Sequence, residues 1–177
     1  MVDYLGLHGL SYTENAGRFP RHSAINSMLK RSLTRIGLPS TWEPVGLTND
    51  GRRPNGLTLG PWYRNRSLSL VWDATVVDTF AQGHYKDYAR QAGFAATKAE
   101  AAKCQKYHDL QSNYHFQPVA IETTGVYGKS TAPFLSGFAK KLVDVSSEPR
   151  EHQWLHQRLS LAVVTGNAAS RLACVQV

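Results

Sequence analysis

Apolar residues recur at helical spacing near the start of the chain. Between His22 and Ile36 they fall three or four positions apart, as on the buried stripe of an amphipathic helix. Gly37 and Pro39 follow this stretch, and both residue types are typical of a helix end. The pattern therefore predicts a first helix over residues 22–36.

Four later stretches have the composition of β-strands. A short β-prone segment covers residues 41–45, a second covers 57–62, and a fourth covers 115–123. The clearest strand covers residues 67–77. Its two alternating faces carry Leu68, Leu70 and Trp72 on one side and Ser69, Val71, Asp73, Thr75 and Val77 on the other.

Three further helices complete the predicted order of elements. An Ala-, Lys- and Gln-rich stretch over residues 85–110 has a helix-forming composition. A helix capped by Ser130 or Thr131 comes next, and a final helix covers residues 150–173. Three strands in a meander, a helical crossover and a fourth strand predict an α/β fold with a mixed central sheet flanked by helices.

Length and composition favour a single folded domain. The chain has 177 residues, which is enough for one hydrophobic core. We expect a basic arm over residues 1–21 and a domain over 22–177. No secretory signal and no membrane-spanning apolar run is apparent. The two cysteines form no CxxC pair, which favours a reducing cytoplasmic or nuclear setting.

The charge of the chain points to nucleic acid as a partner. Lys and Arg number 20 against 13 Asp and Glu, which gives a formal net charge of +7. Such an excess attracts phosphate, although basicity alone is weak support because it also serves solubility. The candidate DNA-binding residues are Arg18, Arg21, Arg52, Arg53, Arg64 and Arg66.

Three acidic residues on predicted strands are candidate metal ligands. Mg²⁺ prefers oxygen ligands, usually one or two carboxylates with water and substrate phosphate. Asp73 is the strongest candidate because it lies in the middle of a strand, and the alternative is that it lies at a strand edge and caps a turn or pairs with an arginine. Glu122 alternatively faces solvent, and Glu43 alternatively forms a salt bridge with a helix.

Basic and aromatic residues cluster on the predicted helix over 85–110. Lys103 and Tyr107 are one helical turn apart and share a face, with Lys106 beside them. A lysine near a reacting phosphate can orient water or stabilise developing negative charge. A solvated helix face is the alternative interpretation.

Four segments together resemble a known nuclease family. They are Arg53-Pro54-Asn55, the stretch 71–78 (VWDATVVD), the stretch 103–107 (KCQKY) and the stretch 118–125 (PVAIETTG). In this order they resemble the restriction-like endonuclease C-terminal to the reverse transcriptase of some non-LTR retrotransposons. That family is similar to archaeal Holliday-junction resolvases and belongs to the PD-(D/E)xK superfamily. The resemblance covers about residues 8–172.

The resemblance implies a fold, an activity and partners. The fold is a restriction-endonuclease-like core of order α-β-β-β-α-β with C-terminal helices. The activity is Mg²⁺- or Mn²⁺-dependent nicking of target DNA, which primes reverse transcription. The remainder of a reverse-transcriptase polyprotein is the implied partner besides DNA. Asp73 takes a metal-binding role, Lys103 or Lys106 the lysine role, and Tyr107 orients that lysine.

Two positions depart from the family pattern. Asn55 stands where the family has an aspartate, and Thr75 stands where the superfamily often has a lysine. A neutral amide is a poor Mg²⁺ ligand, so two alternatives stay open beside the nuclease: a catalytically silent DNA-binding module and a structural domain of a polyprotein. If the metal site is present, Glu43, Asn55, Asp73 and Glu122 should converge on one side of the sheet.

Overall fold

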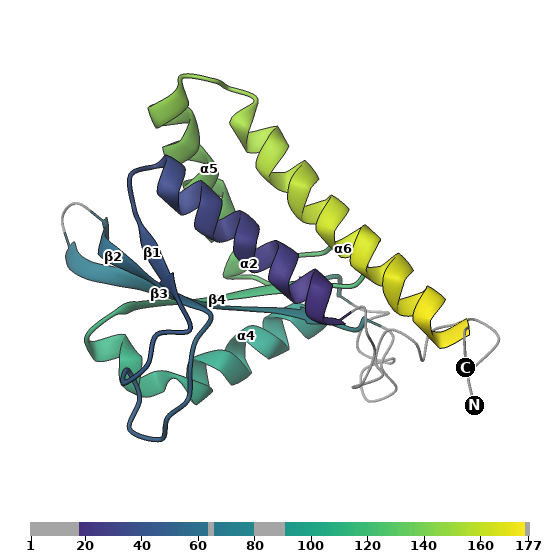
Figure 1. The fold of residues 1–177 in the computed structure, drawn as a ribbon, viewed down its shortest axis with the longest axis horizontal. Helices are drawn as coiled ribbons and strands as arrows, with labels where there is room; N and C mark the ends of the chain where they lie inside the picture. The colour runs from purple at the N-terminus through teal and green to yellow at the C-terminus, as the bar shows by residue number, and fades with distance from the viewer. Residues whose placement is uncertain (1–17, 64–65, 80–90, 176–177) are drawn as a thin grey trace.

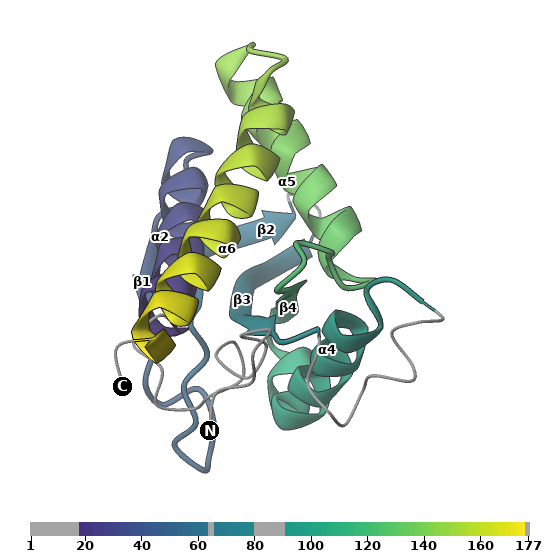
Figure 2. The ribbon, with the colours of Figure 1, turned by 90° about the vertical axis from the view of Figure 1, so that its right-hand side faces the viewer.

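The computed structural model describes residues 18–63, 66–79 and 91–175 of the chain. In this part of the chain a four-stranded sheet has the order β1-β2-β3-β4. Figures 1 and 2 show helices α2, α5 and α6 together on one side of the sheet and α4 on the other side. The predicted mixed α/β architecture is confirmed.

The sheet combines antiparallel and parallel pairing. Strands β1 (Ser40–Trp42), β2 (Gly56–Tyr63) and β3 (Arg66–Val77) form an antiparallel meander. Strand β4 (His115–Glu122) pairs with β3 in parallel after the α4 crossover. The register runs from the Leu70–His115 pair to the Val77–Glu122 pair, so the second half of β3 is hydrogen-bonded to β4.

The helices follow the predicted order. They are α2 (Arg18–Arg35), α4 (Phe94–Lys106), α5 (Thr131–Ser146) and α6 (Glu151–Val175), with a 3₁₀ helix η1 (His108–Ser112) after α4. Among these described helices, none has the length and apolar character that crossing a bilayer requires.

The larger hydrophobic core lies between the sheet and α2, α5 and α6. Every second residue of β3 points into it, as strand geometry requires. Its buried residues are Ile25, Leu29, Leu33, Trp62, Leu70, Trp72, Ala74, Val119, Ile121, Phe134, Leu135, Phe138, Ala139, Leu142, Leu155, Leu159 and Val163. The apolar stripes predicted for the first helix and the two last helices supply much of this core.

A smaller core lies on the opposite face of the sheet, under α4 and η1. It consists of Val71, Tyr107, Leu110 and Phe116. The odd-numbered residues of β3 point to this side, so Asp73 faces α4 rather than the larger core.

Three predicted boundaries are wrong. The first helix begins at Arg18, so residues assigned to the arm continue it, while residues 1–17 lie outside the described part. Strand β1 ends at Trp42, because Glu43 has a left-handed backbone with φ 40° that breaks the strand. Helix α4 begins at Phe94, because Gly93 before it has φ 80°; residues 80–90 lie outside the description.

Pro61 marks an irregularity in the pairing of β2 with β3. The register shifts on both sides of the Pro61–Ser69 pair. Proline has no N–H to donate to the ladder, and a bulge is the usual result. The side-chain hydroxyl of Thr58 accepts a hydrogen bond from the Leu70 N–H at 2.9 Å, which satisfies a ladder donor near the shift.

Candidate functional site

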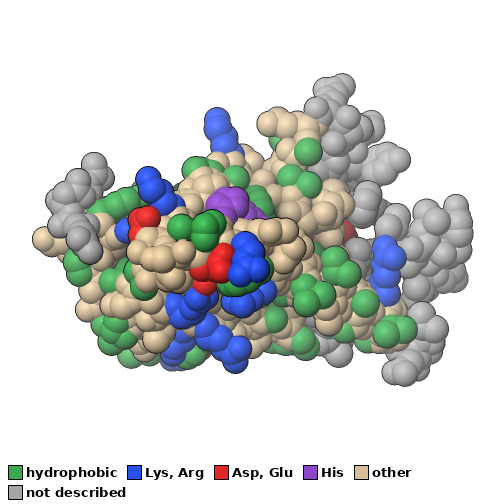
Figure 3. Space-filling view, turned by 90° about the horizontal axis from the view of Figure 1, so that it is seen from above, with side chains coloured by type: hydrophobic (Ala, Val, Ile, Leu, Met, Phe, Trp, Pro, Cys, Tyr) green, Lys and Arg blue, Asp and Glu red, His purple; other side chains and the backbone are tan. Residues whose placement is uncertain are grey.

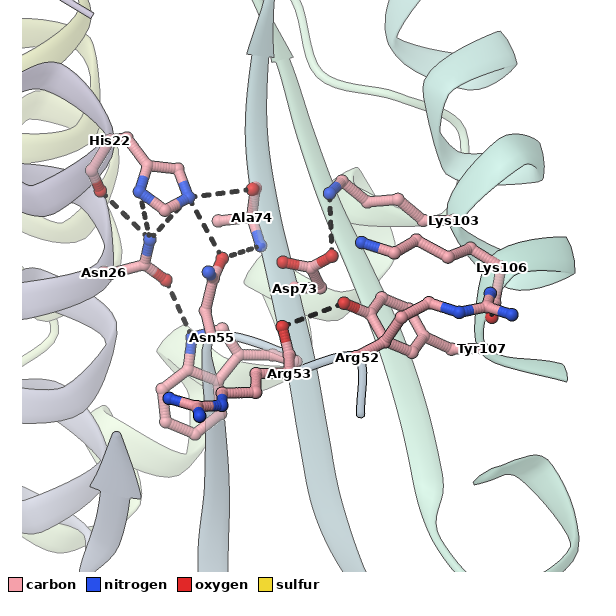
Figure 4. A network of polar contacts seen from close by, with 11 residues as sticks. His22, Asn26, Arg52, Arg53, Asn55, Asp73, Ala74, Lys103, Lys106 and Tyr107 are labelled. Carbon is pink, nitrogen blue, oxygen red and sulfur yellow. Dashed lines mark hydrogen bonds and ion pairs between the residues drawn. The ribbon is translucent and has the colours of Figure 1, made fainter. Parts of the chain in front are cut away.

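Asn55 lies directly before β2 and next to β3. The register pairs Gly56 with Trp72, which brings Asn55 beside the middle of β3. Its side-chain oxygen Oδ1 accepts a hydrogen bond from the Ala74 N–H at 2.6 Å. The same oxygen lies 3.2 Å from Nε2 of His22, which comes from α2 (Figure 4). Asn55 therefore connects the backbone of β3 with α2.

The tautomer of His22 follows from its partners. Nε2 of His22 also lies 3.2 Å from the carbonyl oxygen of Ala74, which can only accept a hydrogen bond. Nε2 therefore carries the proton and donates to both Ala74 and Asn55. Since Oδ1 of Asn55 receives this proton and the Ala74 N–H, the orientation of the Asn55 amide is fixed.

Asn26 extends this network into the core. Its Nδ2 donates to the His22 carbonyl at 3.0 Å, and its Oδ1 accepts from Nε1 of Trp72 at 3.0 Å. Asn26 is 2% exposed and Trp72 is 1% exposed, so both polar groups need these partners. We call His22, Asn26, Asn55 and Trp72 the neutral network.

Asp73 forms an ion pair on the other face of the sheet. Its Oδ2 lies 2.8 Å from Nζ of Lys103 on α4. The Asp73 side chain is 6% exposed and that of Lys103 is 19% exposed, so the pair is shielded from water. The pair satisfies the charge that the strand position would otherwise bury alone. We had considered an arginine as an alternative partner of Asp73, and in the structure the partner is Lys103.

Tyr107 lies against the same pair. Its hydroxyl donates to the carbonyl oxygen of Arg53 at 2.9 Å, and the side chain is buried. Burial and the nearby negative charge of Asp73 raise the pKa of the Tyr107 hydroxyl well above its ordinary value. The Lys106 ammonium lies 4.7 Å from the Tyr107 ring centroid. We call Asp73, Lys103 and Tyr107 the charged cluster.

Basic residues lie on two segments next to the charged cluster. Arg52 and Arg53 come from the loop before β2, and Lys106 from the end of α4; all three are exposed. Arg52 donates to the carbonyl oxygen of Lys106 and pairs with Asp50, which fastens this loop to α4. Figure 4 shows Arg52, Lys103 and Lys106 on the same side of Asp73.

The other predicted arginines divide into two groups. Arg21 is 3% exposed, and its guanidinium donates to Asn167 of α6. Its side chain also packs against Gly166, where a Cβ atom would clash with the Arg21 stem. Arg21 is therefore held against α6 and has little surface left for a contact with DNA. The side chains of Arg18, Arg64 and Arg66 lie outside the described part of the chain.

Glu122 caps the N-terminus of α4. Its Oε1 accepts a hydrogen bond from the Ala95 N–H at 3.0 Å, and the side chain is 1% exposed. A carboxylate at a helix N-terminus satisfies unpaired N–H groups and the helix dipole. Asp73 pairs with Pro118 of β4, and Glu122 lies four residues further along β4, about 13 Å away at the usual rise per strand residue. Glu122 thus does not join Asp73.

A second buried glutamate repeats this arrangement. Glu100 of α4 is 5% exposed and accepts hydrogen bonds from the Ser130 N–H at 2.9 Å and the Thr131 N–H at 2.7 Å. It thereby caps α5, where we expected a Ser130 or Thr131 side chain to do so. No local pattern marks Glu100, because its partners come from a loop thirty residues away.

Glu43 lies on the α2 side of the sheet. Its side chain is exposed, and it lines a surface hollow together with Asn55. A left-handed backbone at a residue other than glycine costs about 1–3 kcal/mol. Glu43 is thus held in an unfavourable conformation beside Asn55, apart from the charged cluster.

The four predicted metal ligands therefore do not form one cluster. Among residues 18–63, 66–79 and 91–175, no three His, Cys, Asp or Glu side chains are grouped so that they could hold a metal ion. Of the three predicted carboxylate ligands, only Asp73 belongs to the charged cluster, and it is paired with Lys103. The oxygen of Asn55 already accepts two hydrogen bonds. This donor set does not fit a Mg²⁺ or Mn²⁺ site.

The neutral network was missed in the sequence analysis. His22 and Asn26 are four residues apart, and Asn26 follows the buried Ile25 on the inner side of the helix. A polar residue at an inward-facing position was the available signal, because a buried amide requires partners.

The chain matches no family model and no curated protein. Its function must be inferred from these two groups of residues.

Proposed function

We propose that this chain is a DNA-binding domain with a nuclease-like site that lacks the metal-binding carboxylate needed for efficient cleavage. The observation that carries the proposal is the pairing of Asp73 with Lys103 at 2.8 Å, beside an Asn55 whose oxygen is already used. A carboxylate neutralised by lysine and a neutral amide leave little negative charge for a divalent cation.

The basic residues around the charged cluster support DNA as the ligand. Arg53, in the loop before β2, and Lys106, at the end of α4, both have exposed side chains, and the whole chain has a net charge of +7. Phosphate groups bind such side chains with release of counterions. On the face shown in Figure 3, basic side chains are also more widespread than acidic ones.

Binding to duplex DNA at several salt concentrations tests this function. Fluorescence anisotropy should show an affinity that falls steeply with salt, and Arg53→Gln with Lys106→Gln should reduce the slope of log K against log salt by about 2. Lys140→Gln on the exposed surface of α5 is the matched control. An affinity that stays constant between low and moderate salt would show that phosphate contacts are not the basis of binding.

The second candidate is the nicking endonuclease that the family resemblance implies, acting within a retroelement polyprotein. The specific observation in its favour is that the acidic and basic residues of the motif, Asp73 and Lys103, are in direct contact. A lysine in this place can stabilise negative charge that develops on a phosphate.

Nicking of supercoiled plasmid separates the two candidates. The wild-type chain should cut little or not at all with Mg²⁺ or Mn²⁺ under the first proposal. Asn55→Asp supplies a carboxylate of nearly the same shape and should increase nicking, and Asp73→Ala in that background should abolish it. Rapid nicking by the wild-type chain would establish the second candidate. If Asn55→Asp does not increase nicking, the missing carboxylate at position 55 is not the sole reason for the low activity.

A further inference from the structure

A hollow of about 520 Å³ lies between the start of α2 and the end of β1. Its walls include Phe19, His22, Trp42, Glu43 and Asn55. The volume falls within the range of small-molecule pockets. The hollow is on the α2 side of the sheet, whereas the charged cluster lies on the α4 side, so it belongs to a different site.

Two aromatic side chains at this hollow are exposed to solvent. Phe19 is 80% exposed and Trp42 is 40% exposed. Large aromatic side chains in contact with water are the usual stacking surfaces for unpaired nucleobases. Lys30 places its ammonium 4.9 Å from the Trp42 ring centroid, which supplies positive charge next to this ring.

The polar wall offers one acceptor group and one donor group. Glu43 is exposed, and among the described residues its carboxylate has no hydrogen bond or ion pair. Oδ1 of Asn55 is occupied by the Ala74 N–H and by His22, so Nδ2 is the group that Asn55 can offer to a ligand. Figure 4 shows this fixed orientation of the amide.

The backbone of Glu43 explains why its side chain is available. In a regular strand, successive side chains point to opposite faces. The left-handed φ of 40° at Glu43 interrupts this alternation, so that Trp42 and Glu43 both line the hollow. Strained backbone of this kind is concentrated at functional sites.

We propose that this hollow binds an unpaired guanine of the DNA. The guanine Watson–Crick edge presents two adjacent N–H donors, which match the Glu43 carboxylate, and a carbonyl oxygen, which matches Nδ2 of Asn55. The adenine edge presents one donor and a ring-nitrogen lone pair, which the carboxylate repels. Thymine and cytosine each present a single donor group next to acceptors. The proposal rests on the proposed function, since it names which part of a bound DNA this site reads.

Three hairpin duplexes test the inference by anisotropy at one salt concentration: fully paired, with one extrahelical guanine, and with one extrahelical adenine. Base stacking on aromatic residues and a read edge should make the guanine form bind about tenfold more tightly than the paired form. The adenine form should gain less. Equal affinity of all three hairpins would overturn the guanine site while leaving duplex binding intact.

Two variants identify the site. Glu43→Gln should remove most of the preference for guanine over adenine, and Trp42→Ala should remove the gain for both extrahelical bases. Asp144→Asn, which deletes an exposed negative charge on α5, is the control and should leave the ratios between hairpins unchanged. Because Trp42 touches Trp72, the Glu43 variant decides the question if Trp42→Ala fails to fold. An undiminished guanine preference in Glu43→Gln would contradict the proposal.

A lack of binding to every hairpin would contradict the proposed function as well as this site. Binding of the guanine hairpin without binding of the paired duplex would instead support the hollow and contradict the phosphate-contact account. The two proposals therefore fail in distinguishable ways.

Discussion

The neutral network and the charged cluster lie on opposite sides of one strand and solve the burial of polar groups differently. On the α2 side, His22, Asn26, Asn55 and Trp72 satisfy one another through directional hydrogen bonds and contain no carboxylate. On the α4 side, Asp73 depends on one ion pair with Lys103. Removing a member of a charged pair leaves a buried charge, whereas removing a member of a neutral network leaves a buried dipole, which costs less.

This difference also bears on metal binding. The neutral network uses the oxygen of Asn55, and the ion pair neutralises Asp73. Each arrangement stabilises the fold and lowers the availability of an oxygen ligand. A carboxylate at position 55 would keep the contacts with Ala74 and His22 and still offer a second oxygen.

The largest effect on stability is expected from Asp73→Ala. The change leaves Lys103 without its partner in a shielded position, and we expect a loss of about 3 kcal/mol in the free energy of unfolding. Urea unfolding measures this loss. Lys103→Met, alone and combined with Asp73→Ala, completes a double-mutant cycle with a coupling of about 2 kcal/mol. A coupling near zero would mean that the pair contributes no net stability.

A smaller effect is expected on the neutral side. Trp72→Phe removes the N–H that Asn26 accepts at 3.0 Å and should cost about 2 kcal/mol, including the volume lost from the core. Trp62→Phe is the matched control, because Trp62 is in the same core and its indole N–H has no hydrogen-bond partner among the described residues. Equal losses in the two variants would show that volume alone determines the cost and that the network adds nothing.

Periodicity predicted the elements of the fold well because their apolar stripes are local in sequence. Ile25, Leu29 and Leu33 in α2, and Phe134, Leu135 and Phe138 in α5, are buried as their spacing indicates. The failures concern backbone conformation. Gly93 adopts a left-handed conformation that stops an otherwise helical composition. Hydrophobic periodicity alone carries no signal for such a stop.

The site was predictable only in part, since its two halves depend on different information. Lys103 and Tyr107 share a helix face, so their proximity follows from their spacing. The contact of Lys103 with Asp73 requires the parallel register of β3 and β4, and that of His22 with Asn55 requires the packing of α2 on the sheet. The role of Glu122 depends on where α4 begins, which composition placed too early.

The smallest effect concerns Tyr107, which joins the charged cluster to the loop before β2. Tyr107→Phe removes the hydrogen bond to the Arg53 carbonyl and should cost about 1 kcal/mol at neutral pH. The raised pKa adds a dependence on pH. The unfolded chain loses the tyrosine proton near its ordinary pKa of about 10, while the folded chain keeps it.

A group whose pKa is raised by folding stabilises the folded state below the unfolded pKa, and this contribution is lost as the pH rises. Between about pH 10 and pH 11 the wild-type chain should therefore lose up to about 1.4 kcal/mol more than Tyr107→Phe, for the one proton concerned. Urea titrations of both proteins from pH 8 to pH 11 measure the difference, and Tyr63→Phe, which removes an exposed hydroxyl, serves as the control. Parallel pH curves for the wild-type chain and Tyr107→Phe would mean that the hydroxyl reaches water and that the cluster is less shielded than its contacts indicate.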